Sequence, residues 1–215
     1  MMTHSHDDRP KLLRDPTARV ARQAQLNRPH VAPLTQFVDG LRLRMRGQVA
    51  GIPYFDPWDG GVDAEVLYLL EAPGAKAVAS EFISRNNPDE TAKNFFELNV
   101  AAGIPRQQTV TWNIVPWYIG SGVRIRPATP SDIQSALEPL GELLALLPRL
   151  RAVVFIGKKA AAGAPFVARL RPDLRQFTTP HPSPLFINNR PGNRERILIV
   201  LRDVALFLRD RDPAV

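Results

Sequence analysis

The sequence predicts an α/β fold: a three-layer α/β/α sandwich around a mostly parallel four-stranded sheet, in a single domain. Two observations predict it. Short apolar runs of strand length alternate along the chain with segments of helical periodicity. The apolar runs also lack the alternation of polar residues typical of half-exposed strands, so both faces of the sheet should be covered. A chain of 215 residues with 44% hydrophobic residues can bury a core of the required size.

Each expected strand is a continuous apolar or β-branched run bounded by turn residues. The run AEVLYLLEAPG ends in Pro-Gly, and RAVVFIG ends in Gly. Such runs are typical of strands buried on both faces of a parallel sheet. The four expected strands are residues 64–74, 108–117, 151–157 and 175–180.

The expected helices show apolar residues at three- and four-residue spacing. In residues 89–103, Phe95, Leu98 and Ala102 share one face, Asp89 is a suitable N-cap and Gly103 a suitable stop. The five expected helices are residues 35–46, 89–103, 131–150, 158–170 and 193–210.

The first 30 residues differ in composition from the rest. They hold few large apolar residues, and Arg and Asp are scattered through them without a helical period. This pattern predicts a flexible basic N-terminal arm over residues 1–30, followed by one folded domain over residues 31–215. The arm could contact a nucleic-acid backbone or be an inert tail.

The overall charge favours a polyanionic partner. Lys and Arg total 28 against 21 Asp and Glu, which gives a net charge of +7 and a pI near 10.3. Nucleic acid or an anionic membrane surface would suit this charge, although it could also serve only solubility. No signal peptide is visible, and no apolar stretch approaches the about 20 residues that a membrane helix needs. We therefore expect a protein without membrane association, in the cytoplasm, or with the nucleoid in a bacterium.

Three polar side chains are expected at one edge of the sheet. Glu71 follows the first expected strand, Asn113 lies on the second and His181 follows the fourth. In open parallel sheets, ligands bind outside the carboxyl ends of the strands. Each residue alone could have a structural role: Glu71 as a helix cap, Asn113 as the partner of a turn, and His181 as a packed imidazole. Their joint placement favours a functional site.

These three groups suit the cleavage of a bond between a sugar and a base. An amide offers a donor and an acceptor side by side, which matches one edge of a pyrimidine. An imidazole can donate to an oxygen that becomes anionic. A carboxylate can orient water or stabilise a cationic sugar. The basic surface would then hold the DNA backbone.

Three ordered motifs resemble those of the uracil-DNA glycosylase superfamily: LEAPG at 70–74, WNIVPW at 112–117 and HPSPL at 181–185. The resemblance covers about residues 50–210. The first motif is similar to the Gly-Glu-Ala-Pro-Gly of the thermostable iron–sulfur branch, and the last to the His-Pro-Ser-Pro-Leu of the main bacterial and eukaryotic enzymes. The chain has no cysteine, so we expect no cluster, no other cofactor and no metal.

The resemblance implies a role for each matching residue. Glu71 would activate or orient the water, His181 would stabilise O2 of the departing uracil anion, and Asn113 would read the flipped base. Phe82 would stack on that base, or else is a core aromatic. Leu185 would wedge into the duplex. Phosphate contacts are expected from the following residues: Ser183, Arg190 and Arg194.

Two residues in the first motif depart from the main branch. Ala72 stands where that branch has its catalytic Asp, so the water role would rest on Glu71. Gly74 stands where it has a Tyr that shuts out thymine, so either another group excludes thymine or the base pocket is more permissive.

The function expected from the resemblance is that of a monofunctional glycosylase. The protein would be a monomer that flips uracil out of DNA and excises it. The alternative is a protein of the same fold that binds uracil, an abasic site or damaged DNA, with weak excision or excision of another base such as hypoxanthine.

Overall fold

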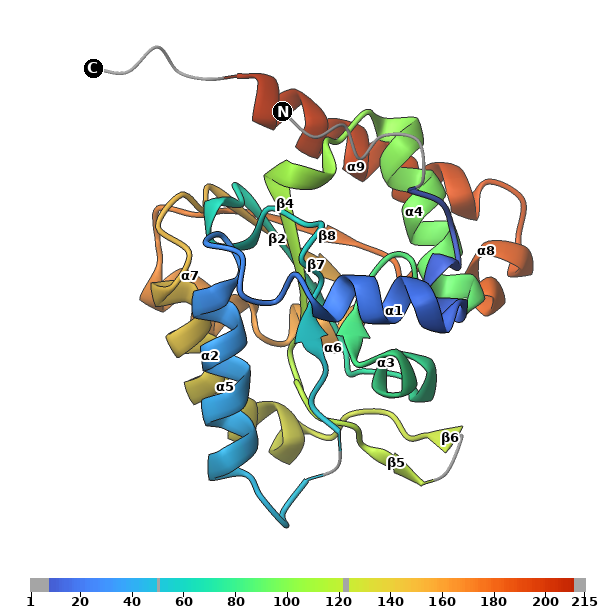
Figure 1. Cartoon of the computed structure of the whole chain (residues 1–215). Coiled ribbons are helices and arrows are strands. Elements are labelled where there is room, and N and C mark those ends of the chain that lie inside the picture. The colour runs from blue at the N-terminus through green and yellow to red at the C-terminus, as the bar shows by residue number, and fades with distance from the viewer. Residues whose placement is uncertain (1–7, 50, 122–123, 211–215) are drawn as a thin grey trace.

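The central sheet has four strands, and every neighbouring pair is parallel (Figure 1). The structure is a computed structural model that describes residues 8–49, 51–121 and 124–210. Across the sheet the strand order is β4-β2-β7-β8. Their bounds are Val66–Leu70 for β2, Thr109–Asn113 for β4, Ala152–Ile156 for β7 and Arg175–Thr179 for β8. The prediction of an α/β fold around a four-stranded sheet is confirmed.

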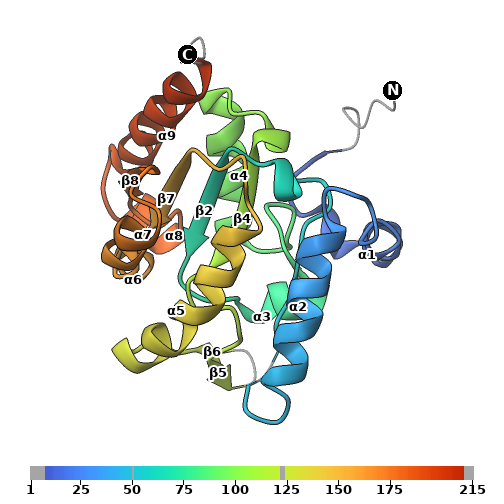
Figure 2. The ribbon, with the colours of Figure 1, turned by 90° about the vertical axis from the view of Figure 1, so that its left-hand side faces the viewer.

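Helices cover both faces of this sheet, as Figure 2 shows. Alternate side chains of β2 enter opposite cores: Val66 and Tyr68 pack on one face, Leu67 and Leu69 on the other. The first face is covered by α4 (Glu90–Ala102) and α9 (Asn193–Arg209). The second is covered by α2 (Ala32–Arg44), α5 (Pro130–Ala145) and α7 (Ala164–Leu170). All five regions expected to be helical contain helix.

Helix boundaries follow the capping residues. The Asp89 carboxylate accepts a hydrogen bond from the Ala92 N–H at 2.9 Å, and α4 ends at Gly103, whose φ is 71°. Helix α5 begins with a reciprocal capping box between Thr129 and Asp132. These local signals are the reason that both helices begin close to their expected positions.

The expected helix over residues 158–170 is instead two helices, α6 (Lys158–Ala161) and α7. Pro165 lies in the first turn of α7. Proline has no N–H to donate to the preceding turn, so it starts a helix more readily than it continues one. Gly163 at the break packs closely, since a Cβ there would lie 2.6 Å from Cδ1 of Ile114.

The remaining elements are short and lie in the connections. Strands β1 and β3 form a parallel pair, and β5 and β6 an antiparallel one. Their bounds, with those of the other short elements, are Leu12–Arg14 (η1), Pro16–Gln23 (α1), Tyr54–Phe55 (β1), Gly61–Asp63 (η2), Ala75–Ser80 (α3), Phe82–Ile83 (β3), Arg106–Gln108 (η3), Gly120–Ser121 (β5), Arg124–Ile125 (β6) and Pro184–Asn189 (α8).

Residues 8–30 fold onto the domain, so the prediction of a flexible arm is wrong for them; residues 1–7 lie outside the described residues. Leu13 is fully buried, and its N–H donates to the carbonyl of Asn86 at 3.1 Å. Arg22, on α1, is also buried and forms an ion pair with Asp56. The sequence pattern failed here because α1 is held by buried charge rather than by an apolar stripe.

Arg22 belongs to a buried ion cluster, which we define as Arg22, Asp56, Asp59, Arg85 and Arg106. Arg106 joins the two acids, with Nη2 2.5 Å from Asp56 Oδ2 and Nε 2.8 Å from Asp59 Oδ1. Burial by itself raises the pKa of Asp56, but the charges of Arg106 and Arg22 outweigh it and hold that pKa well below its usual range. The cluster therefore depends on all its members being present together.

We expect Asp56→Ala to lower the free energy of unfolding by about 3–5 kcal/mol, because it leaves the buried guanidinium of Arg22 without its ion-pair partner and removes one of the acids that bind Arg106. Urea unfolding at pH 7 measures this. Folding lowers the pKa of Asp56, so its stabilising contribution is complete above the usual Asp pKa and is lost as the pH falls.

The matched control is Asp173→Ala, which breaks an exposed pair with Arg171 and should change stability little. Equal effects of the two substitutions would contradict the importance of the buried ion cluster.

Candidate functional site

The register of the sheet brings the predicted polar residues to one edge. Leu70 at the end of β2 pairs with Asn113 at the end of β4, and Ile156 of β7 pairs with Thr179 of β8. Glu71 directly follows β2, and His181 comes two residues after β8. Because parallel strands in register end at the same edge, Glu71, Asn113 and His181 share it.

His181 is held in place from two sides. Gly157, which follows β7, has a φ of 89°, and a Cβ there would lie 3.3 Å from the Cβ of His181. Glycine therefore allows the imidazole to approach the backbone. On the other side, Nδ2 of Asn94 on α4 donates to the carbonyl of Pro182 at 3.0 Å. The loop that carries His181 is thus fixed by an element far away in the sequence.

The electrostatic environment of His181 favours the uncharged imidazole. Burial lowers the pKa of His181, and the negative charges of Glu71 and Asp89 offset this only in part. A neutral imidazole keeps one N–H to donate and brings no positive charge of its own. It can therefore stabilise an oxygen that becomes anionic during a reaction.

Glu71 is held by backbone groups. The main-chain carbonyl of Glu71 accepts from the Val115 N–H at 3.0 Å, which extends the pairing of β2 and β4 past their ends. One carboxylate oxygen, Oε1, accepts from the Ala128 N–H at 2.7 Å. The carboxylate is therefore fixed through one oxygen, and the other can orient a water molecule.

Asn113 offers an unused hydrogen-bond donor. The residue is only 4% exposed, and its Nδ2 has no hydrogen-bond partner among the described residues. The hydroxyl of Thr179, at the end of β8, is also buried and unpaired. A buried donor without a partner costs about 1–3 kcal/mol, so an acceptor on a ligand at this edge would relieve that cost.

The other residues predicted to bind the base differ in their surroundings. Phe82 has no exposed surface and belongs to neither apolar core cluster, so a base could stack on it only if the side chains covering it moved. Ala72 is partly buried against the core. Gly74 begins α3, and a Cβ there would meet no heavy atom within 4 Å. The space beside Gly74 is therefore open.

The predicted DNA-binding residues cluster on α8 and the start of α9. Leu185 is 85% exposed, an unusual state for a large apolar side chain. Ser183 caps α8, with its hydroxyl accepting from the Phe186 N–H at 3.3 Å. Arg190 is exposed at the end of α8, whereas Arg194 pairs with Glu97 of α4 at 3.3 Å. Only a weak, exposed pair occupies Arg194, which leaves it able to exchange partners.

Sequence analysis missed the residues that support Glu71 and His181. The side chain of Asn94 donates to the backbone carbonyl of Pro182, and the backbone N–H of Ala128 donates to Glu71. Backbone groups exist at every position, so nothing in the sequence marks these two. In the sequence, the prolines on both sides of His181 indicate a constrained loop, but they do not show which groups hold it.

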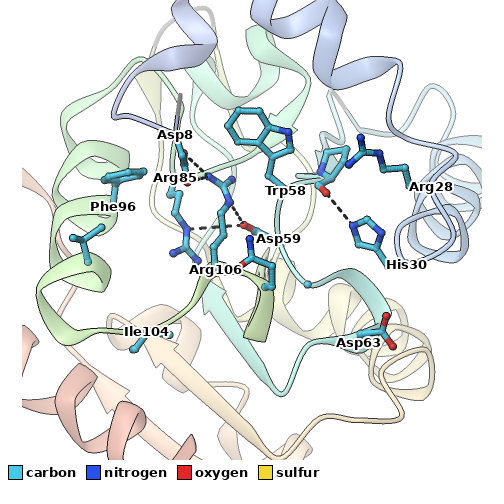
Figure 3. Close-up of a pocket in the computed structure, with 14 residues that line it drawn as sticks. Asp8, Arg28, His30, Trp58, Asp59, Asp63, Arg85, Phe96, Ile104 and Arg106 are labelled. Atoms are coloured by element: carbon cyan, nitrogen blue, oxygen red, sulfur yellow. Dashed lines mark hydrogen bonds and ion pairs between the residues drawn. The ribbon is translucent and has the colours of Figure 1, made fainter. Parts of the chain in front are cut away.

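A cavity lies elsewhere, at the amino end of β2 and β4 (Figure 3). It has a volume of about 780 Å³, and none of the predicted site residues lines it. Its wall includes Asp59, Arg85 and Arg106 of the buried ion cluster, together with Asp8. Arg106 also binds Asp8 at 2.9 Å, so the charges in this wall largely satisfy one another. We therefore attribute its polar lining to folding rather than to chemistry.

Two further observations concern the described part of the chain. No group of three or more His, Cys, Asp or Glu side chains there is arranged to hold a metal ion. No helix there is long and apolar enough to cross a bilayer. The iron–sulfur cluster of the branch with a similar first motif requires cysteines, and the chain has none.

Comparison with known proteins identifies a family. The family described as the Uracil DNA glycosylase superfamily matches residues 48–205. A solution NMR structure of a candidate uracil DNA glycosylase from Methanosarcina acetivorans shares 17% sequence identity, with a TM-score of 0.47; the match covers 67% of this chain and 92% of that one. No curated protein matches the chain. The family match includes Glu71, Asn113 and His181.

We expect His181 to titrate below the ordinary histidine pKa of about 6.5. Glu71→Gln should lower the pKa of His181 further, since it removes a negative charge that raises it. NMR titration of the imidazole protons, assigned with His181→Gln, measures both values. Because folding lowers this pKa, the contribution of His181 to stability should fall as the pH drops below about 6.5. A pKa at or above 6.5 would contradict this description of the site.

Proposed function

This chain belongs to the uracil DNA glycosylase superfamily, and on that premise we propose that it is a monofunctional glycosylase that excises uracil from DNA. The observation that carries the proposal is the grouping at one sheet edge of a fixed carboxylate, a neutral imidazole and an unpaired buried amide: Glu71, His181 and Asn113. These are the groups that hydrolysis of an N-glycosidic bond requires.

In the proposed reaction, water replaces the base at C1′ of the deoxyribose. The bond between C1′ and the base nitrogen breaks, and its electron pair leaves with the base. Glu71 orients the water through its free oxygen and stabilises the positive charge that develops on the sugar. His181 donates a hydrogen bond to the O2 atom of the departing anion. The water oxygen bonds to C1′, its proton is released, and the base is finally protonated.

The choice of base would depend on Asn113 and Gly74. The free Nδ2 donor of Asn113 suits a carbonyl oxygen of the flipped base. Beside Gly74 no side chain narrows the space, which favours acceptance of deaminated bases larger than uracil, such as hypoxanthine. We propose uracil as the principal substrate, with these bases as further ones.

The proposed DNA contacts centre on α8. Leu185 would enter the duplex and fill the space that the flipped nucleotide leaves, which offsets part of the few kcal/mol that extrusion costs. Ser183, Arg190 and Arg194 would contact phosphates. The net charge of +7 supports binding to a polyanion.

We expect the protein to release uracil from labelled oligonucleotides that are then cleaved with alkali. Glu71→Gln and His181→Ala should each lower the single-turnover rate by roughly 100-fold or more, because each removes a group that acts in the transition state. The matched control is Glu138→Gln, an exposed glutamate on α5, which should keep the rate. Oligonucleotides with hypoxanthine or thymine test the width of the pocket.

The same assay separates the proposed function from its alternative. Tight binding of uracil-containing or abasic DNA without any cleavage would identify a damage-binding protein of this fold. The absence of both cleavage and binding would contradict both functions.

We expect Leu185→Ala to lower uracil excision from double-stranded DNA by about 10-fold or more, while excision from single strands changes much less. A single strand has no stacked partner to replace, so the wedge has less to contribute there. Leu206→Ala, at an exposed leucine on α9, is the matched control. Equal losses on both substrates would show that Leu185 does not act as a wedge.

A further inference from the structure

We infer that Lys159 is a positioning residue for Glu71, acting through the backbone of Ala128. This inference rests on the proposed function, because it assigns a role in the same reaction. Lys159 lies on α6, just beyond the carboxyl end of β7, and does not belong to any of the three motifs that carry the family resemblance. Its side chain is partly buried, unlike that of its exposed neighbour Lys158.

Two consecutive hydrogen bonds connect the ammonium group with the carboxylate. Nζ of Lys159 donates to the carbonyl of Ala128 at 2.6 Å. The N–H of Ala128 donates to Oε1 of Glu71 at 2.7 Å. Ala128 thus forms one hydrogen bond with Glu71, which follows β2, and another with Lys159, which lies beyond β7. Any shift of Ala128 would move the donor that fixes the Glu71 carboxylate.

Other contacts among the described residues position the segment around Ala128. After it, Thr129 caps α5 in a reciprocal arrangement with Asp132. Arg126, before it, binds both oxygens of Asp132 at 2.6 and 2.9 Å. The Ala128 methyl group is buried in the core. These contacts set where the segment enters α5, whereas the bond from Lys159 holds the carbonyl of the residue that contacts Glu71.

A lysine at this edge could instead bind a DNA phosphate. The geometry argues against this as the main role, because the Lys159 ammonium already has an acceptor at 2.6 Å within the protein. A buried carbonyl that loses its donor also costs free energy, so Lys159 is not free to leave Ala128.

The first test compares Lys159→Met, Lys159→Arg and the control Lys158→Met under single-turnover conditions at saturating DNA. We expect Lys159→Met to lower the excision rate roughly 10- to 100-fold with little change in DNA affinity, because a misplaced carboxylate impairs the reaction rather than binding. Lys159→Arg should restore much of the rate, and Lys158→Met should keep it. Weaker DNA binding with an unchanged rate for Lys159→Met would overturn the inference and identify a phosphate contact.

The second test combines the substitutions. If Lys159 acts through Glu71, Lys159→Met should lower the rate no further once Glu71→Gln is present. Losses that multiply would show that Lys159 acts independently of Glu71, and would overturn the inference. Thermal unfolding of each variant identifies any loss of rate that comes from misfolding.

A third measurement does not depend on catalysis. The ¹H–¹⁵N resonance of the Ala128 amide should shift between the wild type and Glu71→Gln, because the substitution removes the charged acceptor of that N–H. It should also shift in Lys159→Met, but not in Lys158→Met. If the wild type cleaves no base, the proposed function fails while this measurement still tests the positioning. An Ala128 amide that ignores Glu71 would overturn the inference even in an active enzyme.

Discussion

The parallel register of β4, β2, β7 and β8 is the constraint on which the rest of the structure depends. Four strands that run in one direction and pair in register must end at one edge. Three of the four therefore deliver a polar side chain to the same place, although Glu71 and His181 are 110 residues apart in the chain. The fourth, β7, contributes Gly157, whose missing side chain makes room for the imidazole. The sheet thus serves both as the core of the domain and as the frame of the candidate site.

The two ends of this sheet differ in how their buried polar groups are paired. At the amino end, the buried ion cluster surrounds Arg106 with acids and connects α1 to the segment that follows β1. Most of these charges pair with one another and give structural order, although Nη2 of Arg22 and Oδ2 of Asp59 have no hydrogen-bond partner among the described residues. At the carboxyl end, Asn113 and Thr179 keep buried polar groups without partners. Unsatisfied groups cost stability, so their position beside Glu71 and His181 is better explained by a ligand than by folding.

Segments outside the strands hold Glu71 and the loop that carries His181. The carboxylate of Glu71 is bonded to the segment before α5, and the loop of His181 is bonded to α4. Since α4 and α5 lie on opposite faces of the sheet, the two groups are held from both outer layers. This arrangement keeps Glu71 and His181 at defined positions before any substrate binds, which is the condition for electrostatic stabilisation of a transition state.

The sequence by itself determined the fold class and the order of the strands and helices along the chain, and it predicted that Glu71, Asn113 and His181 share one edge of the sheet. These features depend on local periodicity, on capping residues such as Asp89, and on side chains that follow strands. Only the tertiary structure decided the rest. It placed residues 8–30 on the domain, because Arg22 is held by Asp56, which lies far along the chain. It also revealed Asn94, Ala128 and Lys159 as supports, because they act through backbone groups that every residue has, and only folding decides which of these groups meet.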